Sequence, residues 1–169
     1  MLKKLSVKKI CLGGIFIALT YVFTMFISIP LSSTGYINLS DFFIVFTTIS
    51  LDPICGLLVS IIAPALADLT LGYFIYIPFT ILSKFLEFLV VYLIFNKIKG
   101  NIKYALLWLG AFVMALVYIV PDLIVLGFDQ YLVALVNFGF NFLQGMVGLI
   151  LGLIVHQIFK KTKMLDKIG

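Results

Sequence analysis

The sequence has little charge and no arginine. Only 11% of its 169 residues are charged, 63% are hydrophobic, and the mean hydropathy is +1.24. Ordinary soluble domains are about 45–50% apolar, so a soluble chain of this length could not bury so much apolar surface. The scarcity of charge therefore argues against a soluble domain and favours an integral membrane protein.

Motifs for nucleotide hydrolysis and catalysis are also missing. The chain contains no G-x-x-x-x-G-K-[ST] segment for nucleotide phosphates and no H-E-x-x-H segment for zinc. Its one histidine, His156, lies near the end of the last hydrophobic stretch, where it cannot serve a serine nucleophile in the membrane core. Cys11 and Cys55 show no metal-ligand spacing. We therefore expect no enzyme activity, no metal site and no cofactor.

Hydrophobic stretches separated by turn-rich segments predict six helices and an all-α fold. Since each span needs about 20 residues, six would use most of the chain and form a single membrane domain over residues 1–169. The predicted helices are Val7–Ile29, Asp41–Leu51, Ile54–Leu69, a fourth that ends near Phe95, Tyr104–Val120 and Leu132–Phe159. The second is short for a span, so a re-entrant hairpin is an alternative there.

Lysine positions predict the orientation of these helices. Eleven of the twelve lysines form three clusters: Lys3, Lys4, Lys8 and Lys9; Lys97, Lys99 and Lys103; Lys160, Lys161, Lys163 and Lys167. The loops after the first, third and fifth helices contain none. Because cytoplasmic segments are enriched in lysine, six spans with both termini in the cytoplasm fit this pattern. The clusters thus indicate membrane topology, and we expect no nucleic-acid partner.

The twelfth lysine lies in "FTILSKFLEF" (Phe79–Phe88), one of the most hydrophobic stretches of the chain. Lys84 is roughly 16 Å from either end of its predicted helix, too deep for its amine to reach water. Glu87 follows on the same helix face. The pair either makes a structural bridge or faces a polar cavity where one member holds a ligand. Because a structural pair is costly compared with two leucines, we favour ligand binding.

Three amides share one face of the last predicted helix. Asn137, Asn141 and Gln144 are spaced by four and three residues, and Gly145, Gly148 and Gly152 continue nearly the same face. Each amide can both donate and accept hydrogen bonds, which suits a ligand with ring nitrogens and hydroxyl groups. Hydrogen bonds between helices are the alternative role.

Several other polar residues lie near the predicted outer ends of the helices. Asp68 follows the small-residue run "APALAD", where ligand binding and solvation are equally supported. Asp41 lies in the first turn of its helix, where the helix dipole favours a capping carboxylate. Asp122 is interpreted as a loop residue. Tyr36 and Tyr73, in lysine-free loops, are candidates either for a membrane-interface belt or for covering a planar ligand.

The first helix contains a small-xxx-small pair, Gly14 and Ala18, within "GGIFIA". Such pairs allow another helix to approach closely. The pair therefore serves either packing within this chain or contact with a partner protein.

Taken together, these segments resemble the substrate-binding S component of energy-coupling factor (ECF) vitamin transporters. The resemblance covers nearly the whole chain and rests on the lysine-rich start, the small-xxx-small pair, "GYINLSD" (Gly35–Asp41), "ALADLTLGYFIYIPFTILSKFLE" (Ala65–Glu87) and "NFLQGMVGLILG" (Asn141–Gly152). It implies a six-helix protein of the prokaryotic plasma membrane that captures a vitamin near the outer surface. The loop after the first helix would act as a lid.

The resemblance also implies partners. Such S components dock onto a transmembrane T component that carries two cytoplasmic ATPases, which use the ATP, and they topple in the membrane to release substrate inward. The implied docking residues are Gly14 and Ala18, which depart from the family's AxxxA motif but keep a smooth surface.

The chain looks most similar to S components for pyridoxine-type vitamins or hydroxymethylpyrimidine. The expected substrate-binding residues are Lys84, Glu87, Asn137, Asn141, Gln144, Asp68, Tyr36 and Tyr73. Riboflavin and folate are larger and would need a roomier pocket, while queuosine precursors and pantothenate remain open. The alternative function is a stand-alone secondary carrier or channel with Glu87 as its proton or ion site, although no internal repeat supports it.

Overall fold

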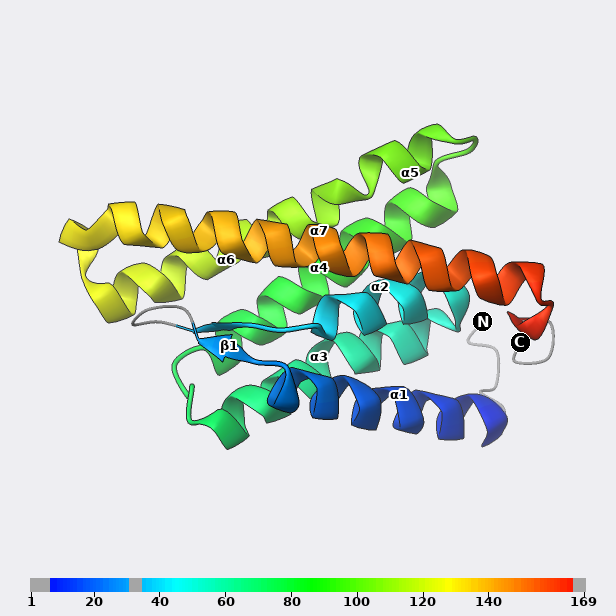
Figure 1. Ribbon diagram of the computed structural model, residues 1–169, viewed down its shortest axis with the longest axis horizontal. Coiled ribbons are helices and arrows are strands. Elements are labelled where there is room, and N and C mark those ends of the chain that lie inside the picture. The colour runs from blue at the N-terminus through cyan, green and yellow to red at the C-terminus, as the bar shows by residue number, and fades with distance from the viewer. Residues whose placement is uncertain (1–6, 31–34, 166–169) are drawn as a thin grey trace.

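Six helical segments form the protein in the computed structural model, which describes residues 7–30 and 35–165 (Figure 1). They are α1 (Val7–Phe26), α2 (Ser40–Ser50), α3 (Pro53–Leu71), α4 (Ile77–Lys97), the consecutive pair α5 (Ile102–Leu106) and α6 (Trp108–Leu126), and α7 (Tyr131–Lys161). A 3-10 turn, η1 (Phe128–Gln130), precedes α7. Between α1 and α2, two-residue strands β1 (Ile29–Pro30) and β2 (Tyr36–Ile37) pair antiparallel. The all-α membrane fold predicted from the sequence is confirmed.

Five of the six segments, all except α2, are long and apolar enough to cross a membrane. The 11 residues of α2 are equivalent to about 16 Å of helix, which is too short for a span. An extended stretch that includes β2 leads into α2 from one end of the molecule (Figure 1). Non-helical backbone at membrane depth is tolerated where it is enclosed by protein or lines a cavity.

Two predicted helix ends are wrong. The first helix was expected to reach Ile29, but α1 ends at Phe26 and Ile29 lies in β1. The fifth helix was expected to stop before Pro121, but α6 continues to Leu126 and has Pro121 in its interior. Proline removes one backbone hydrogen bond, yet the helix persists because further apolar residues follow and membrane helices tolerate such a loss. The helix ends instead at Gly127, where φ is 92°. Asp122 is therefore a helix residue, and the interpretation of it as a loop residue is wrong.

The lysine clusters gather at one end of the molecule. The start of α1, the α4–α5 connection and the end of α7 all lie there (Figure 1). This arrangement brings together the clusters at Lys9, Lys97–Lys103 and Lys160–Lys163, as the even-span prediction requires. Lys3, Lys4, Lys167 and the side chain of Lys8 lie outside the described residues, as does part of the expected lid, residues 31–34.

Apolar side chains cover much of the outer surface. Phe128, Leu132 and Ile124 are 78%, 63% and 54% exposed, and similar residues recur along the other long helices. Exposed apolar patches of this extent would be unfavourable in water but are expected against lipid.

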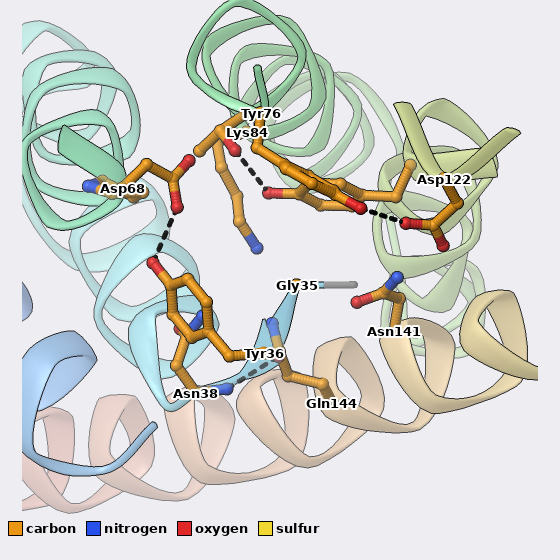
Figure 2. A pocket seen from close by; sticks show the side chains of 12 residues that line it. Gly35, Tyr36, Asn38, Asp68, Tyr76, Lys84, Asp122, Asn141 and Gln144 are labelled. Atoms are coloured by element: carbon orange, nitrogen blue, oxygen red, sulfur yellow. Dashed lines mark hydrogen bonds between the residues drawn. The ribbon is translucent and has the colours of Figure 1, made fainter. Parts of the chain in front are cut away.

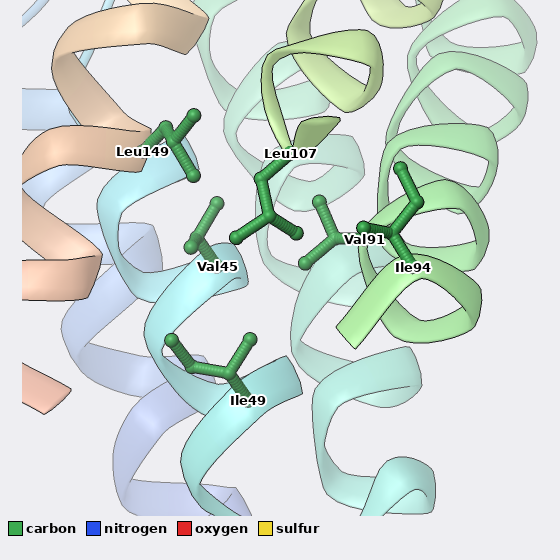
Figure 3. Close-up of a cluster of buried hydrophobic side chains, with 6 residues drawn as sticks. All are labelled: Val45, Ile49, Val91, Ile94, Leu107 and Leu149. Atoms are coloured by element: carbon green, nitrogen blue, oxygen red, sulfur yellow. The ribbon is translucent and has the colours of Figure 1, made fainter. Parts of the chain in front are cut away.

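The apolar core lies toward the lysine-bearing end. Val45 and Ile49 of α2 pack with Val91 and Ile94 of α4, Leu107 and Leu149 (Figure 3). Here α7 approaches α2 so closely that a Cβ added at Gly148 would lie 2.5 Å from the Cβ of Asp41. This approach fixes α2 against α7, and with it the position of Asp41.

Helix α1 lies at the edge of the bundle, where it packs on α3 and α2 (Figure 1). Only 17% of its apolar segment Lys9–Phe26 is buried, the lowest share among the five candidate spans. Gly14 and Ala18 are both exposed, and a Cβ added at Gly14 would meet nothing within 4 Å. The small-xxx-small pair therefore faces outward.

Candidate substrate-binding cavity

A small polar cavity lies in the half of the bundle away from the lysine clusters (Figure 2). Five parts of the chain line it: the β2 region, α3, α4 with the residue before it, α6 and α7. The lining residues are Gly35, Tyr36, Asn38, Pro64, Asp68, Tyr76, Thr80, Lys84, Tyr118, Asp122, Asn141 and Gln144. Its volume is about 30 Å³. That is room for about two water molecules.

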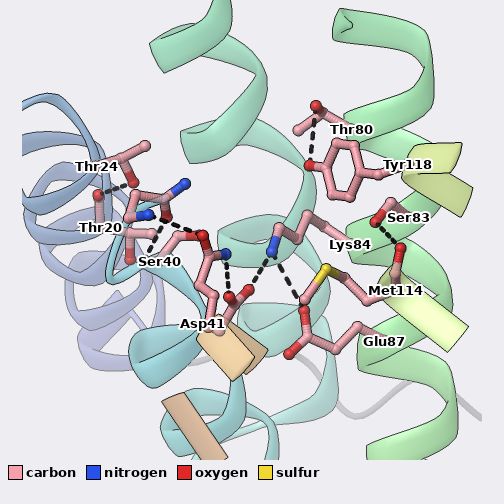
Figure 4. A network of polar contacts seen from close by, with 12 residues as sticks. Thr20, Thr24, Ser40, Asp41, Thr80, Ser83, Lys84, Glu87, Met114 and Tyr118 are labelled. Carbon is pink, nitrogen blue, oxygen red and sulfur yellow. Dashed lines mark hydrogen bonds and ion pairs between the residues drawn. The ribbon is translucent and has the colours of Figure 1, made fainter. Parts of the chain in front are cut away.

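Lys84, which lines the cavity, forms an ion pair with Asp41, which lies behind the wall; this buried pair with its neighbours is called the floor below (Figure 4). The Lys84 amine donates to Asp41 Oδ1, and Gln144 Nε2 donates to Asp41 Oδ2. Glu87 Oε2 lies 3.6 Å from the Lys84 nitrogen. Asp41 is completely buried, while Lys84 and Glu87 are each 1% exposed. The floor thus joins α2 and α4 through a buried ion pair, and α2 and α7 through a buried amide hydrogen bond.

The β2 region closes over the cavity through two hydrogen bonds. The backbone N–H of Asn38 donates to Gln144 Oε1 at 2.8 Å, and the Tyr36 hydroxyl donates to Asp68 Oδ1, also at 2.8 Å. Burial, followed by the negative charge of Asp68, raises the pKa of the Tyr36 hydroxyl above its ordinary value. The phenol therefore keeps its proton and remains a donor to Asp68. This Tyr36–Asp68 contact, called the latch below, ties β2 to α3.

Asp122 lies at the opposite side of the cavity from Asp68 and accepts hydrogen bonds from two side chains (Figure 2). The Tyr76 hydroxyl donates to Asp122 Oδ1 at 2.6 Å, and Asn137 Nδ2 donates to Asp122 Oδ2 at 3.0 Å. These bonds connect α4, α6 and α7. Tyr118 and Thr80 add a further hydroxyl pair on the wall, 3.1 Å apart.

The structure brings five of the eight predicted site residues to the cavity wall: Lys84, Asn141, Gln144, Asp68 and Tyr36. Three are not on the wall. Glu87 lies beside Lys84, and Asn137 donates to Asp122. Tyr73 packs on Tyr36 with ring centroids 5.1 Å apart and its hydroxyl 3.5 Å from Gly35 O.

Sequence reasoning missed several lining residues and one supporting residue. Asp41, expected to cap a helix, pairs with Lys84, and Asp122, expected in a loop, accepts from Tyr76. His156 is 7% exposed, and its Nδ1 lies 2.9 Å from Ser50 Oγ. Two signals were available: Asp41 is the single charged residue of its helix, and Asp122 lies inside an apolar stretch that continues past Pro121.

The chemistry of the cavity is that of binding. Its wall offers carboxylates, amides, phenols and one amine, and among the described residues no three acidic, histidine or cysteine side chains converge where they could hold a metal ion. A helical bundle with largely lipid-exposed helices around a small polar cavity is typical of a membrane protein that binds a small polar molecule.

Comparison with known proteins then gives the family. The model of the family "ECF-type riboflavin transporter, S component" matches residues 4–163. The chain belongs to this family, and it is an integral membrane, vitamin-binding subunit of an ECF transporter. The family is a transporter component and not an enzyme class. Among curated proteins, no match is found.

Proposed function

We propose that this chain captures a vitamin B6 vitamer or hydroxymethylpyrimidine from the outer side of a prokaryotic plasma membrane. Both ligands are single heteroaromatic rings with hydroxymethyl groups. The proposal places the lysine-rich end in the cytoplasm, so the cavity lies in the outer half of the membrane.

The observation that carries the proposal is the polar wall of a very small cavity. Amides at Asn141 and Gln144 match ring nitrogens and hydroxyl groups, and Tyr36 and Tyr76 supply aromatic surface. Any vitamin must displace the latch, because about 30 Å³ holds no organic ring. A one-ring ligand requires less displacement of the walls than a three-ring flavin.

Riboflavin is the second candidate, since the matching family is described by that substrate. It would require a wider opening between the β2 region and α6–α7 than a one-ring vitamin. The two candidates therefore differ in size and in spectrum, because riboflavin is yellow and fluorescent.

The test is to purify the protein in detergent from cells and identify the retained ligand by mass spectrometry. Titrations with B6 vitamers, hydroxymethylpyrimidine and riboflavin follow on ligand-free protein. We expect saturable binding of a one-ring vitamin and weak or absent binding of riboflavin. If riboflavin is retained and titrations with the one-ring vitamins show no binding, riboflavin replaces them as the assigned substrate.

We further propose that delivery depends on a T component and two cytoplasmic ATPases, which use the ATP. Uptake into liposomes should then require all of these subunits and ATP. The competing function is a stand-alone carrier with Glu87 as a proton site. Proton-driven uptake by this chain alone, lost in Glu87→Gln, would support the carrier and overturn the dependence on partners.

A further inference from the structure

The buried polar layer around the cavity holds more acid than base. Four carboxyl groups (Asp41, Asp68, Glu87 and Asp122) and one amine (Lys84) are each at most 3% exposed. Ionised groups buried at membrane depth are costly unless opposite charges or hydrogen bonds compensate them. Either protons on the carboxyl groups or a ligand that brings positive charge can supply this compensation.

The charge of Lys84 is already committed to the cavity floor. Its amine donates to Asp41 and lies 3.6 Å from Glu87, so two carboxyl groups share one amine. Gln144 adds a neutral donor to Asp41. The Lys84 amine makes its ion pairs with Asp41 and Glu87, and not with Asp68.

Asp68 is an under-satisfied carboxylate on the wall. Its Oδ1 accepts the latch hydrogen bond from Tyr36, whereas Oδ2 is buried and makes no hydrogen bond to the described residues. The residue is 3% exposed and lines the cavity (Figure 2). When a ligand opens the latch, both oxygens of Asp68 become available to it.

We propose that the ligand is positively charged when bound, as an amine or a protonated ring nitrogen, and that Asp68 is its counter-ion. The inference rests on the proposed function and specifies the chemistry of the captured molecule. An N–H donor on a cation makes a stronger hydrogen bond to a carboxylate than a hydroxyl does.

Two B6 vitamers separate the charge of the ligand from its shape. Pyridoxamine carries an aminomethyl group, an aliphatic amine that is protonated at neutral pH, where pyridoxine carries a hydroxymethyl group. The ring and the remaining substituents are the same. We expect purified protein to bind pyridoxamine at least tenfold more tightly than pyridoxine.

Asp68→Asn then tests the counter-ion. Asparagine has nearly the same shape and can still accept from Tyr36, so the latch is retained while the charge is lost. We expect the preference for pyridoxamine over pyridoxine to fall at least tenfold, because the charged vitamer loses more binding free energy than the neutral one. Asp129→Asn, an exposed carboxylate in η1, is the matched control and should leave both affinities unchanged.

Equal affinity for the two vitamers, or an equal loss of both in Asp68→Asn, overturns the inference while the captured vitamin remains a one-ring compound. Binding that disappears when sodium is replaced by choline also overturns it, because a metal ion then supplies the charge. Flat titrations with every one-ring ligand would overturn the inference and the proposed function together.

Discussion

At the scale of single residues, Lys84 shows how a charge is accommodated in the membrane interior. Its main partner is not the nearby Glu87 but Asp41, 43 residues earlier in the chain. Removing one member of a buried pair leaves the other uncompensated, which costs about 3–5 kcal/mol. The pair therefore stabilises the fold as well as forming the cavity floor.

We expect Lys84→Met to lower the thermal unfolding temperature in detergent and to weaken ligand binding. Adding Asp41→Asn should restore part of the stability, because one stranded carboxylate is then neutral. Lys99→Met, at an exposed lysine, serves as the control. Strictly additive effects of the two substitutions on unfolding would show that Lys84 and Asp41 are not coupled.

The latch gives a second prediction at this scale. Ligand and Tyr36 compete for Asp68, so Tyr36→Phe should raise ligand affinity roughly fivefold, equivalent to one hydrogen bond of about 1 kcal/mol. Tyr73→Phe is the control, since its hydroxyl makes only the 3.5 Å contact with Gly35 O. A loss of affinity in Tyr36→Phe would instead mean that the hydroxyl contacts the ligand.

At the scale of helices, the polar face of α7 organises the site. Asn137, Asn141 and Gln144 are buried on the same side as Gly145, Gly148 and Gly152. Asn141 and Gln144 line the cavity, and Asn137 donates to the lining residue Asp122. The glycines allow α2 and α6 to approach α7. One helix face thus sets both the cavity wall and the position of Asp41.

Gly148→Ala should therefore destabilise the protein and weaken binding, because the added methyl group would lie 2.8 Å from the backbone nitrogen of Phe42. Overpacking of this kind costs about 1–3 kcal/mol. Gly139→Ala on the same helix meets nothing within 4 Å and should be neutral or slightly stabilising. Thermal unfolding of both variants in detergent makes the comparison, and equal unfolding temperatures would contradict the close approach.

The helices show what sequence patterns can and cannot predict. Hydropathy predicted the six helices, and lysine placement predicted that the lysine-bearing helix ends lie at the same end of the molecule. Both signals depend on local composition. The amide face of α7 and the depth of Lys84 were also readable from spacing within one helix. The partners Asp41 and Asp122 were not, because a helix-end carboxylate looks the same whether it caps its own helix or pairs with another.

At the scale of the whole molecule, binding and docking use different surfaces. The cavity is enclosed by α3, α4, α6, α7 and the β2 region, whereas Gly14 and Ala18 face outward from α1. We expect Gly14→Leu or Ala18→Leu to leave ligand affinity unchanged and to abolish uptake with the T component and ATPases. Gly139→Leu adds similar bulk on an open part of α7 and is the control. Full uptake by the α1 variants would remove the docking assignment.

The pairing of Asp41 with Lys84 also has a consequence for biogenesis. The carboxylate leaves the ribosome 43 residues ahead of the amine, so α4 enters the bilayer where its counter-charge is already present. A central lysine alone costs about 2.5–3.5 kcal/mol on insertion. We expect α4 to integrate more efficiently behind α1–α3 than by itself, and Asp41→Leu to reduce that gain, as measured by glycosylation of an acceptor site during translation with microsomes. Equal integration in every context would mean that α4 enters on its hydrophobicity alone.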